Sequence, residues 1–125
     1  METYYSKTHE WVKIKADGNE AIVGITKYAV ENLLDISYIE LPELDKDLIV
    51  DEISAKIESG ESNVDVHSPL SGTVMEINDE LEDSPELLAK APETYGWLYR
   101  LENIDTDELE DLMDKNEYME YLKSL

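Results

Sequence analysis

Residues 57–72 read Ile-Glu-Ser-Gly-Glu-Ser-Asn-Val-Asp-Val-His-Ser-Pro-Leu-Ser-Gly, and this stretch carries most of the information about the fold. Its Val64–Val66 segment alternates apolar and polar residues, which predicts a β-strand. Gly60 tolerates the backbone angles of a turn. Ser68-Pro69 and Ser71-Gly72 bracket a tight reversal, because Pro fixes φ and Gly permits positive φ. The stretch therefore predicts extended segments joined by tight turns.

Short apolar or alternating runs recur along the rest of the chain between turn signals, which predicts a mainly β protein. Asp17-Gly18 predicts a hairpin turn between the first two runs. No linker or low-complexity segment divides the chain, so we expect residues 1–125 to form a single domain. The expected strands are Trp11–Lys15, Ala21–Ile25, Ile36–Leu41, Leu48–Val50, Ile53–Ile57, Val64–Val66, Thr73–Ile77 and Trp97–Leu101.

Three short helices are expected beside these strands. Thr26 can cap the N-terminus of a helix that runs through Leu34. Ser84, Pro85 and Glu86 have the order of an N-cap, a first-turn proline and a favourable negative charge. An acidic capping-box pattern over 105–108 opens a C-terminal helix of about residues 106–123. Its apolar stripe predicts docking on the core, with a partner groove as the alternative. The stripe consists of Leu109, Leu112, Met113, Tyr118, Tyr121 and Leu122.

The composition limits the kinds of partner. The net charge of −21 disfavours nucleic-acid backbones, whose phosphates repel such a surface. The same charge favours basic protein surfaces, although it can equally serve only to solvate a small domain. No apolar run approaches the roughly 20 residues that span a bilayer, and no signal peptide is recognisable. We therefore expect no membrane partner and a cytoplasmic location, or the mitochondrial matrix for a mature eukaryotic form.

Catalytic motifs are missing from the sequence. It has no phosphate-binding Gly-rich loop, no zinc-protease His pair and no Gly-x-Ser-x-Gly elbow. The lack of Cys excludes disulfides and thiolate metal ligands. His9 and His67, with Glu10 and Asp65, are the one metal-site alternative, and isolated His residues beside carboxylates are more often structural. We expect neither enzymatic activity nor a bound metal.

The sequence resembles the glycine cleavage system H protein family. The hairpin of that family typically reads Val-Glu-Ser-Val-Lys-Ala-Ala-Ser-Asp-Ile-Tyr-Ser-Pro-Val-Ser-Gly, which aligns with residues 57–72. The opening segment 4–12, the segment 23–29 and the pattern 81–87 also resemble the family in the same order. The resemblance implies a flattened β sandwich or barrel of the lipoyl-domain type (a barrel-sandwich hybrid), with short flanking helices and a C-terminal helix.

The resemblance also implies the chemistry of the hairpin tip. Family members carry lipoate on a Lys at this tip, and Glu61 stands at the equivalent position. A carboxylate cannot form the amide that a lysine amine forms, so no lipoate cofactor is expected on Glu61. Ser59, Gly60 and Ser62 complete the tip. Glu61 can be a contact for a basic partner side chain, or a residue that drifted after the modification was lost.

The family cleft that receives the aminomethylated arm is also implied by resemblance. Thr8, Glu10 and Asp65 match its polar positions, and Asn32 stands where some members have a His. We expect a non-lipoylated scaffold or regulatory module that contacts glycine-cleavage or lipoate-handling enzymes. One alternative is a working carrier with its arm on Lys56. Another is a small-ligand binding protein that uses the Glu10 and Asp65 cleft.

Overall fold

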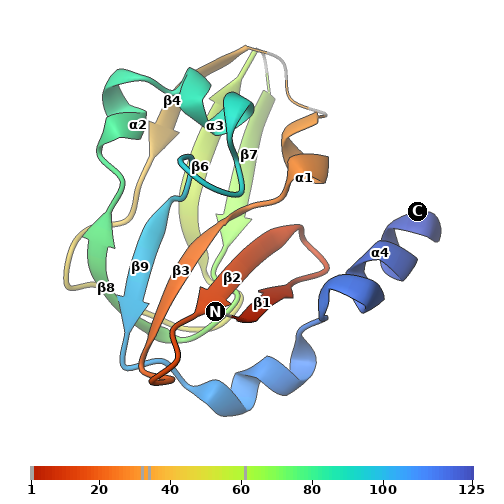
Figure 1. Ribbon diagram of the computed structural model, residues 1–125. Helices are drawn as coiled ribbons and strands as arrows, with labels where there is room; N and C mark the ends of the chain where they lie inside the picture. The colour runs from red at the N-terminus through yellow and green to blue at the C-terminus, as the bar shows by residue number, and fades with distance from the viewer. Residues whose placement is uncertain (1, 32, 34, 61) are drawn as a thin grey trace.

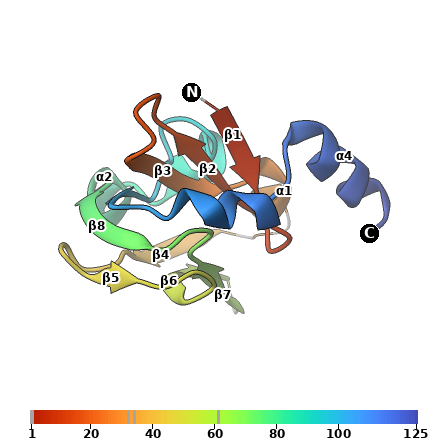
Figure 2. The same ribbon diagram turned by 90° about the horizontal axis from the view of Figure 1, so that it is seen from below.

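The computed structural model describes residues 2–31, 33, 35–60 and 62–125. These residues form two antiparallel β-sheets that face each other as a sandwich and do not close into a barrel (Figures 1 and 2). Short helices flank the sheets, and the last helix lies at one side of the sandwich (Figure 1). The predicted mainly β fold is confirmed. The resemblance allowed a flattened sandwich or a barrel, and the structure is a sandwich.

The larger sheet has the strand order β1-β2-β3-β9-β8-β5. Its strands are β1 (Glu2–Tyr5), β2 (Glu10–Ile14), β3 (Glu20–Ile25), β9 (Tyr99–Glu102), β8 (Gly72–Ile77) and β5 (Asp47–Leu48). The smaller sheet has the order β4-β6-β7. It consists of β4 (Ile36–Glu40), β6 (Ile53–Ser59) and β7 (Ser62–His67). Every predicted strand segment overlaps one of these strands, and β1 was not predicted.

The core lies between the two sheets, where alternate strand residues point inward. Val12 and Val23 of the larger sheet and Ile57 and Val66 of the smaller one are fully buried. Each strand has a period of two, so the intervening side chains face solvent or a helix. A second cluster, outside the sandwich, packs Trp11 against the C-terminal helix.

The turns and short helices mostly follow their sequence signals. Gly18 has φ 74 in the predicted hairpin turn between β2 and β3. Helix α1 (Lys27–Glu31) begins after Thr26, whose hydroxyl accepts from the Ala29 N–H at 3.3 Å. The predicted helix end at Leu34 falls outside the described residues.

The expected N-cap at Ser84 is wrong. Ser84 is the C-terminal cap residue of α2 (Glu80–Asp83), and Pro85 occupies the N-cap of α3 (Glu86–Lys90). The N–H of Ser84 donates to the carbonyl of Glu80, so this residue closes one helix before the next begins.

The prediction of one C-terminal helix over about residues 106–123 is also wrong, because the structure has two separate helices there. A 3-10 helix, η1 (Thr106–Asp111), is followed by an extended stretch and then by α4 (Lys115–Lys123). Met113 exchanges two backbone hydrogen bonds of 2.8 Å with Tyr5 of β1, which requires an extended backbone. Asp114 and Glu117 form a capping box that starts α4 afresh.

Candidate functional site

The β6–β7 hairpin ends at the position that the sequence resemblance assigns to a modified residue. Ser59 and Ser62 are the last register pair of the two strands. Gly60 follows with φ 59, which favours glycine, and its N–H donates to the Asp35 carbonyl at 3.0 Å. Glu61 falls outside the described residues. The tip is therefore tied by its backbone to the segment that precedes β4.

A surface hollow of about 560 Å3 lies beside this tip. Leu33, Ile36 and Ala89 give it apolar walls, and Asp35 and Glu86 add carboxylates. The hollow is open to solvent and is bounded by the hairpin, the start of β4 and helix α3. Its apolar walls and acidic groups match the chemistry of a Lys or Arg side chain, whose aliphatic stem packs while its charge pairs.

Glu10 is the most deeply buried carboxylate of the site, with 2% of its surface exposed. The Ser6 hydroxyl donates to its Oε1 at 2.6 Å, and the Thr8 hydroxyl donates to the same oxygen. The His67 N–H donates to Oε2 at 3.2 Å. Burial raises the pKa of the Glu10 carboxyl above its ordinary value, and these hydrogen bonds oppose the rise. Groups of this chain thus occupy both carboxylate oxygens.

Hydrogen bonds in the described structure join two of the four predicted cleft residues. Thr8 and Glu10 are joined by a hydrogen bond. Asp65 is exposed on β7, where its register partner is Lys56 of β6. Asn32 falls outside the described residues. Where side chains are described, no hydrogen bond joins Asp65 to Glu10, although the His67 N–H on the same strand reaches Glu10. The shared cleft stays a prediction.

Sequence reasoning missed two partners of Glu10. Ser6 lies four residues earlier, and its hydroxyl also accepts from the Glu10 N–H at 3.0 Å. The alternation of Ser6, Thr8 and Glu10 leading into β2 was an available signal. The second partner is the backbone N–H of His67, which no side-chain pattern could reveal. The His67 Nδ1 is buried without a hydrogen-bond partner among the described residues.

The two His residues occupy separate environments. His9 Nδ1 lies 2.9 Å from the Tyr118 hydroxyl, and its ring packs on Tyr28 at a centroid distance of 4.6 Å. His67 instead approaches Glu10 through its backbone. Within the described ranges, no group of three His, Asp or Glu residues could hold a metal ion. The expected absence of metal stays a prediction.

Lys56, the alternative attachment residue for lipoate, lies on a strand and not in a turn. Lys56 is exposed on the outer face of β6, with Glu40 and Asp65 as its register partners on either side. Lys46 precedes β5 and pairs with Glu52 at 3.5 Å. Neither amine is at the hairpin tip.

None of the described helices combines the length and the hydropathy that a membrane crossing requires.

Comparisons with known proteins agree with the fold. A family model described as "Glycine cleavage H-protein" matches residues 3–125. The glycine cleavage system H protein of Thermotoga maritima is 46% identical over 117 residues, covering 94% of this chain and 93% of that protein. The Halothermothrix orenii protein of the same name is 43% identical over 121 residues, covering 97% and 93%.

A solved structure gives the same result in three dimensions. The crystal structure of a glycine cleavage system H protein from Mycobacterium marinum superposes with a TM-score of 0.85. The alignment covers 99% of this chain and 98% of that chain at 29% identity. The match to the family model spans nearly the whole sequence, and the relatives exceed 40% identity over almost their full lengths. The chain therefore belongs to the glycine cleavage H-protein family.

Proposed function

We propose that this chain is a member of the H-protein family that carries no lipoyl group and acts by protein contact. The observation that supports this is Glu61, which stands at the tip position where the family resemblance expects the modified Lys. A carboxylate offers no nitrogen for the amide bond to lipoate. The chain keeps the carrier scaffold and lacks the acceptor, so it is a scaffold or regulatory module and not a catalyst.

The geometry around the tip supports a contact role. The Gly60 N–H is bound to the Asp35 carbonyl, so the tip has a fixed relation to the hollow beside it. Asp35 and Glu86 make that hollow acidic, within a chain of net charge −21. A basic surface is the complementary partner. Glycine-cleavage or lipoate-handling enzymes that bind H proteins are the proposed partners, in the cytoplasm, and neither nucleic acid nor membrane is involved.

Intact-mass spectrometry tests the missing acceptor. The chain is co-expressed with a lipoate–protein ligase in medium containing lipoate, beside a lysine-bearing H protein as the positive control. We expect the control to gain one lipoyl group and this chain to keep its unmodified mass. A single lipoyl adduct on the native chain would overturn the proposal.

A substitution at the tip sharpens this experiment. Glu61→Lys supplies the amine, while Gly60, Ser62 and Asn63 still differ from the typical family tip. We expect Glu61→Lys to gain much less lipoate than the control H protein, because the ligase also meets the altered neighbours. Lipoylation of Glu61→Lys to the level of the control would show that the lysine alone was missing.

The carrier alternative, with the arm on Lys56, has less support. Lys56 lies in the middle of β6 and has acidic register partners on both sides, so it is not on a protruding loop. Lys56→Arg is the matched variant. If the native chain did gain a lipoyl group and Lys56→Arg lost it, the carrier alternative would replace the proposal.

The small-ligand alternative is weakened by the geometry of Glu10. Both Glu10 oxygens are already bonded within the chain, and Asp65 is exposed on β7. A metabolite that raised the melting temperature of the native chain but not of Glu10→Ala would revive this alternative.

A further inference from the structure

Strand β4 stops before its neighbour β6 does. The two strands pair from Ile36–Ser59 to Glu40–Lys56. Pro42 has no backbone N–H and disfavours continued pairing, so the chain leaves the sheet after Glu40. β6 extends three residues further, over 53–55, and there it pairs with β7 alone in the described structure, with a register shift between Ile53 and Ala55. One backbone edge of β6 is therefore left without a neighbouring strand.

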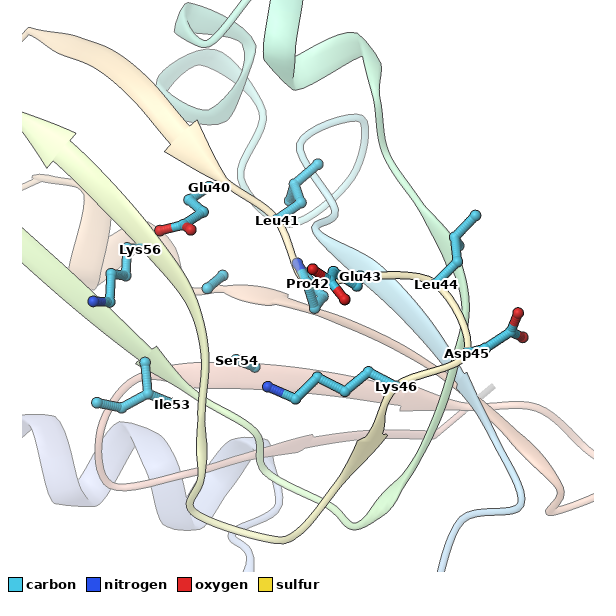
Figure 3. A pocket seen from close by; sticks show the side chains of 11 residues that line it. Glu40, Leu41, Pro42, Glu43, Leu44, Asp45, Lys46, Ile53, Ser54 and Lys56 are labelled. Atoms are coloured by element: carbon cyan, nitrogen blue, oxygen red, sulfur yellow. The ribbon is translucent and has the colours of Figure 1, made fainter.

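A hollow of about 620 Å3 lies along this edge (Figure 3). The connection from β4 to β5 swings outward through Leu44 and returns at Lys46, whose side chain points back toward Ser54 (Figure 3). Ser54 and Ala55 line the hollow although both are buried. The volume is within the range of about 300–1,000 Å3 that is usual for ligand sites. The missing strand has thus left space beside the free edge.

Apolar side chains are exposed around the hollow. Ile53 is 43% exposed and Leu44 is 57% exposed, and they lie on opposite sides of the space (Figure 3). Large apolar side chains exposed around a hollow are typical of an interaction site. They offer anchors for the side chains of an added segment.

The charges around the hollow favour a basic occupant. Glu40, Glu43 and Asp45 line it. Of its two lysines, Lys46 pairs with Glu52 at 3.5 Å, and Lys56 has acidic register partners. The local excess of carboxylates agrees with the net charge of −21. A positively charged segment is complementary to this surface, and an acidic one is repelled by the whole molecule.

We propose that the hollow along residues 53–55 is a docking site for an extended basic segment of a partner protein, which adds to β6 as a short strand where β4 stops. Such strand addition draws its affinity from main-chain hydrogen bonds and its specificity from side-chain anchors. Three paired residues span about 10 Å. This inference deepens the proposed contact function by naming a second surface, distinct from the hairpin tip, and it does not depend on the state of Glu61.

The free edge of β7 is a poorer site. Its residues Asn63 and Asp65 are polar and exposed, so that edge lacks apolar anchors. The free side of β1 is bridged at Tyr5 by Met113. Among the described residues, the hollow beside the β6 edge, of about 620 Å3, is larger than the one of about 460 Å3 beside β1.

Amide NMR and hydrogen exchange on the full chain test the site. The probe is an acetylated and amidated octapeptide of alternating Lys and Val, added to the isotope-labelled protein. We expect shift changes at residues 53–55, and exchange of at least one of these amides slowed about tenfold at saturation. Matched controls are the same peptide with alternate N-methylated amides, which cannot pair as a strand, and its Glu-Val counterpart. Both should bind at least about tenfold more weakly.

Two variants connect binding to the hollow. Leu44→Ser removes an anchor and Glu43→Lys reverses a charge, and each should weaken the basic peptide by about fivefold or more. Both positions are exposed loop sites, and the amide spectrum checks that the fold is kept. Glu110→Lys, an exposed position in η1 outside the hollow, is the matched charge control and should leave binding unchanged.

The proposal fails if the N-methylated peptide binds equally well, if the acidic peptide binds better, or if residues 53–55 do not respond. The lipoylation experiment is independent of these results. A lipoylated native chain that still bound the peptide would overturn the proposed function and leave this site intact. A chain that stayed unmodified and did not bind the peptide would overturn this site and leave the proposed function standing.

Discussion

Gly24 and Trp11 are register partners across the β2–β3 pair. A Cβ built on Gly24 would overlap the Trp11 indole ring, whose Nε1–H donates to the Pro92 carbonyl at 3.0 Å. The indole is nearly fully buried and has no room to shift without losing that bond. The absence of a side chain at Gly24 is therefore what lets the Trp11 ring lie against β3.

We expect Gly24→Ala to lower the free energy of unfolding by about 1–3 kcal/mol, which is the usual cost of overpacking a core. Urea unfolding followed by tryptophan fluorescence measures this change. The matched control is Gly18→Asn, because no atom lies within 4 Å of its built Cβ and Asn tolerates positive φ. Positive φ leaves some strain even for Asn, so the control should lose stability, but clearly less than Gly24→Ala does. Equal losses in the two variants would refute the steric explanation.

Glu10 should give the stability an unusual pH dependence. Because burial raises its pKa in the folded state, the folded protein holds the proton more tightly than the unfolded chain does. Its contribution to stability is fully present below the unfolded pKa, near 4.5, and is lost as the pH rises through the raised folded value. Glu10→Gln removes this titration.

The measurement is the free energy of unfolding of both proteins from pH 4.5 to pH 8. We expect the stability of Glu10→Gln relative to the native chain to increase as the pH rises across this window. Gln has one acceptor oxygen fewer than Glu for the Ser6, Thr8 and His67 donors. We therefore also expect a constant, pH-independent difference between the unfolding free energies of the two proteins. Parallel curves across the window would contradict the raised pKa.

At the level of elements, α4 is attached to the sandwich mainly through Tyr118. Its ring stacks on Tyr5 with a centroid distance of 4.6 Å. Its hydroxyl lies 2.8 Å from the Thr26 hydroxyl and 2.9 Å from His9 Nδ1. Burial raises the pKa of Tyr118 to about 12. One side chain thus connects α4 to β1, to the β1–β2 turn and to the start of α1.

Tyr118→Phe should cost about 1–3 kcal/mol, because it keeps the stacked ring and leaves the hydroxyl of Thr26 without this buried partner. Hydrogen exchange of the α4 amides and urea unfolding report the loss. Tyr121→Phe is the matched control, since among the described residues the Tyr121 hydroxyl bonds only to the Lys7 carbonyl, at an exposed site. If Tyr121→Phe were the more damaging change, the proposed attachment would be wrong.

The elements also show which features a sequence can predict. The alternation of β2, β3 and β6 is local, so their strands were predicted to within two residues. β9 begins at Tyr99 and not at Trp97, because the Asn78 side chain donates to the carbonyls of Tyr95 and Trp97 and holds that segment as a loop. β1 was missed because four residues carry too little pattern. The break at Met113 depends on a backbone pairing with Tyr5, which is distant in sequence.

The candidate site was only partly predictable, because it too depends on contacts between residues that are distant in sequence. Family resemblance identified Thr8 and Glu10, which do bond to each other. It also assigned Asp65 to the cleft, and Asp65 is an exposed residue of β7, so its place in the cleft stays a prediction. The His67 N–H that completes the Glu10 environment is a backbone group, and backbone donors have no sequence signature.

At the scale of the molecule, the net charge of −21 opposes folding by self-repulsion. Added salt screens this repulsion, so we expect the melting temperature to rise between about 0.01 M and 0.3 M NaCl, where the Debye length shortens from about 30 Å to less than 8 Å. Asp83→Lys with Glu110→Lys, both at exposed positions, reduces the repulsion and should show a smaller rise. An equal or larger rise in the double variant would contradict this account.

The pairing of Met113 with Tyr5 has a practical consequence for handling the protein. Because Met113 bridges the outer side of β1 at Tyr5, proteolysis in the connection at 104–112 would free the backbone N–H and carbonyl of Tyr5 beside the Trp11 cluster. An uncovered strand of this kind is a template for association between molecules. Clipped preparations should therefore self-associate before they unfold, and intact ones should not.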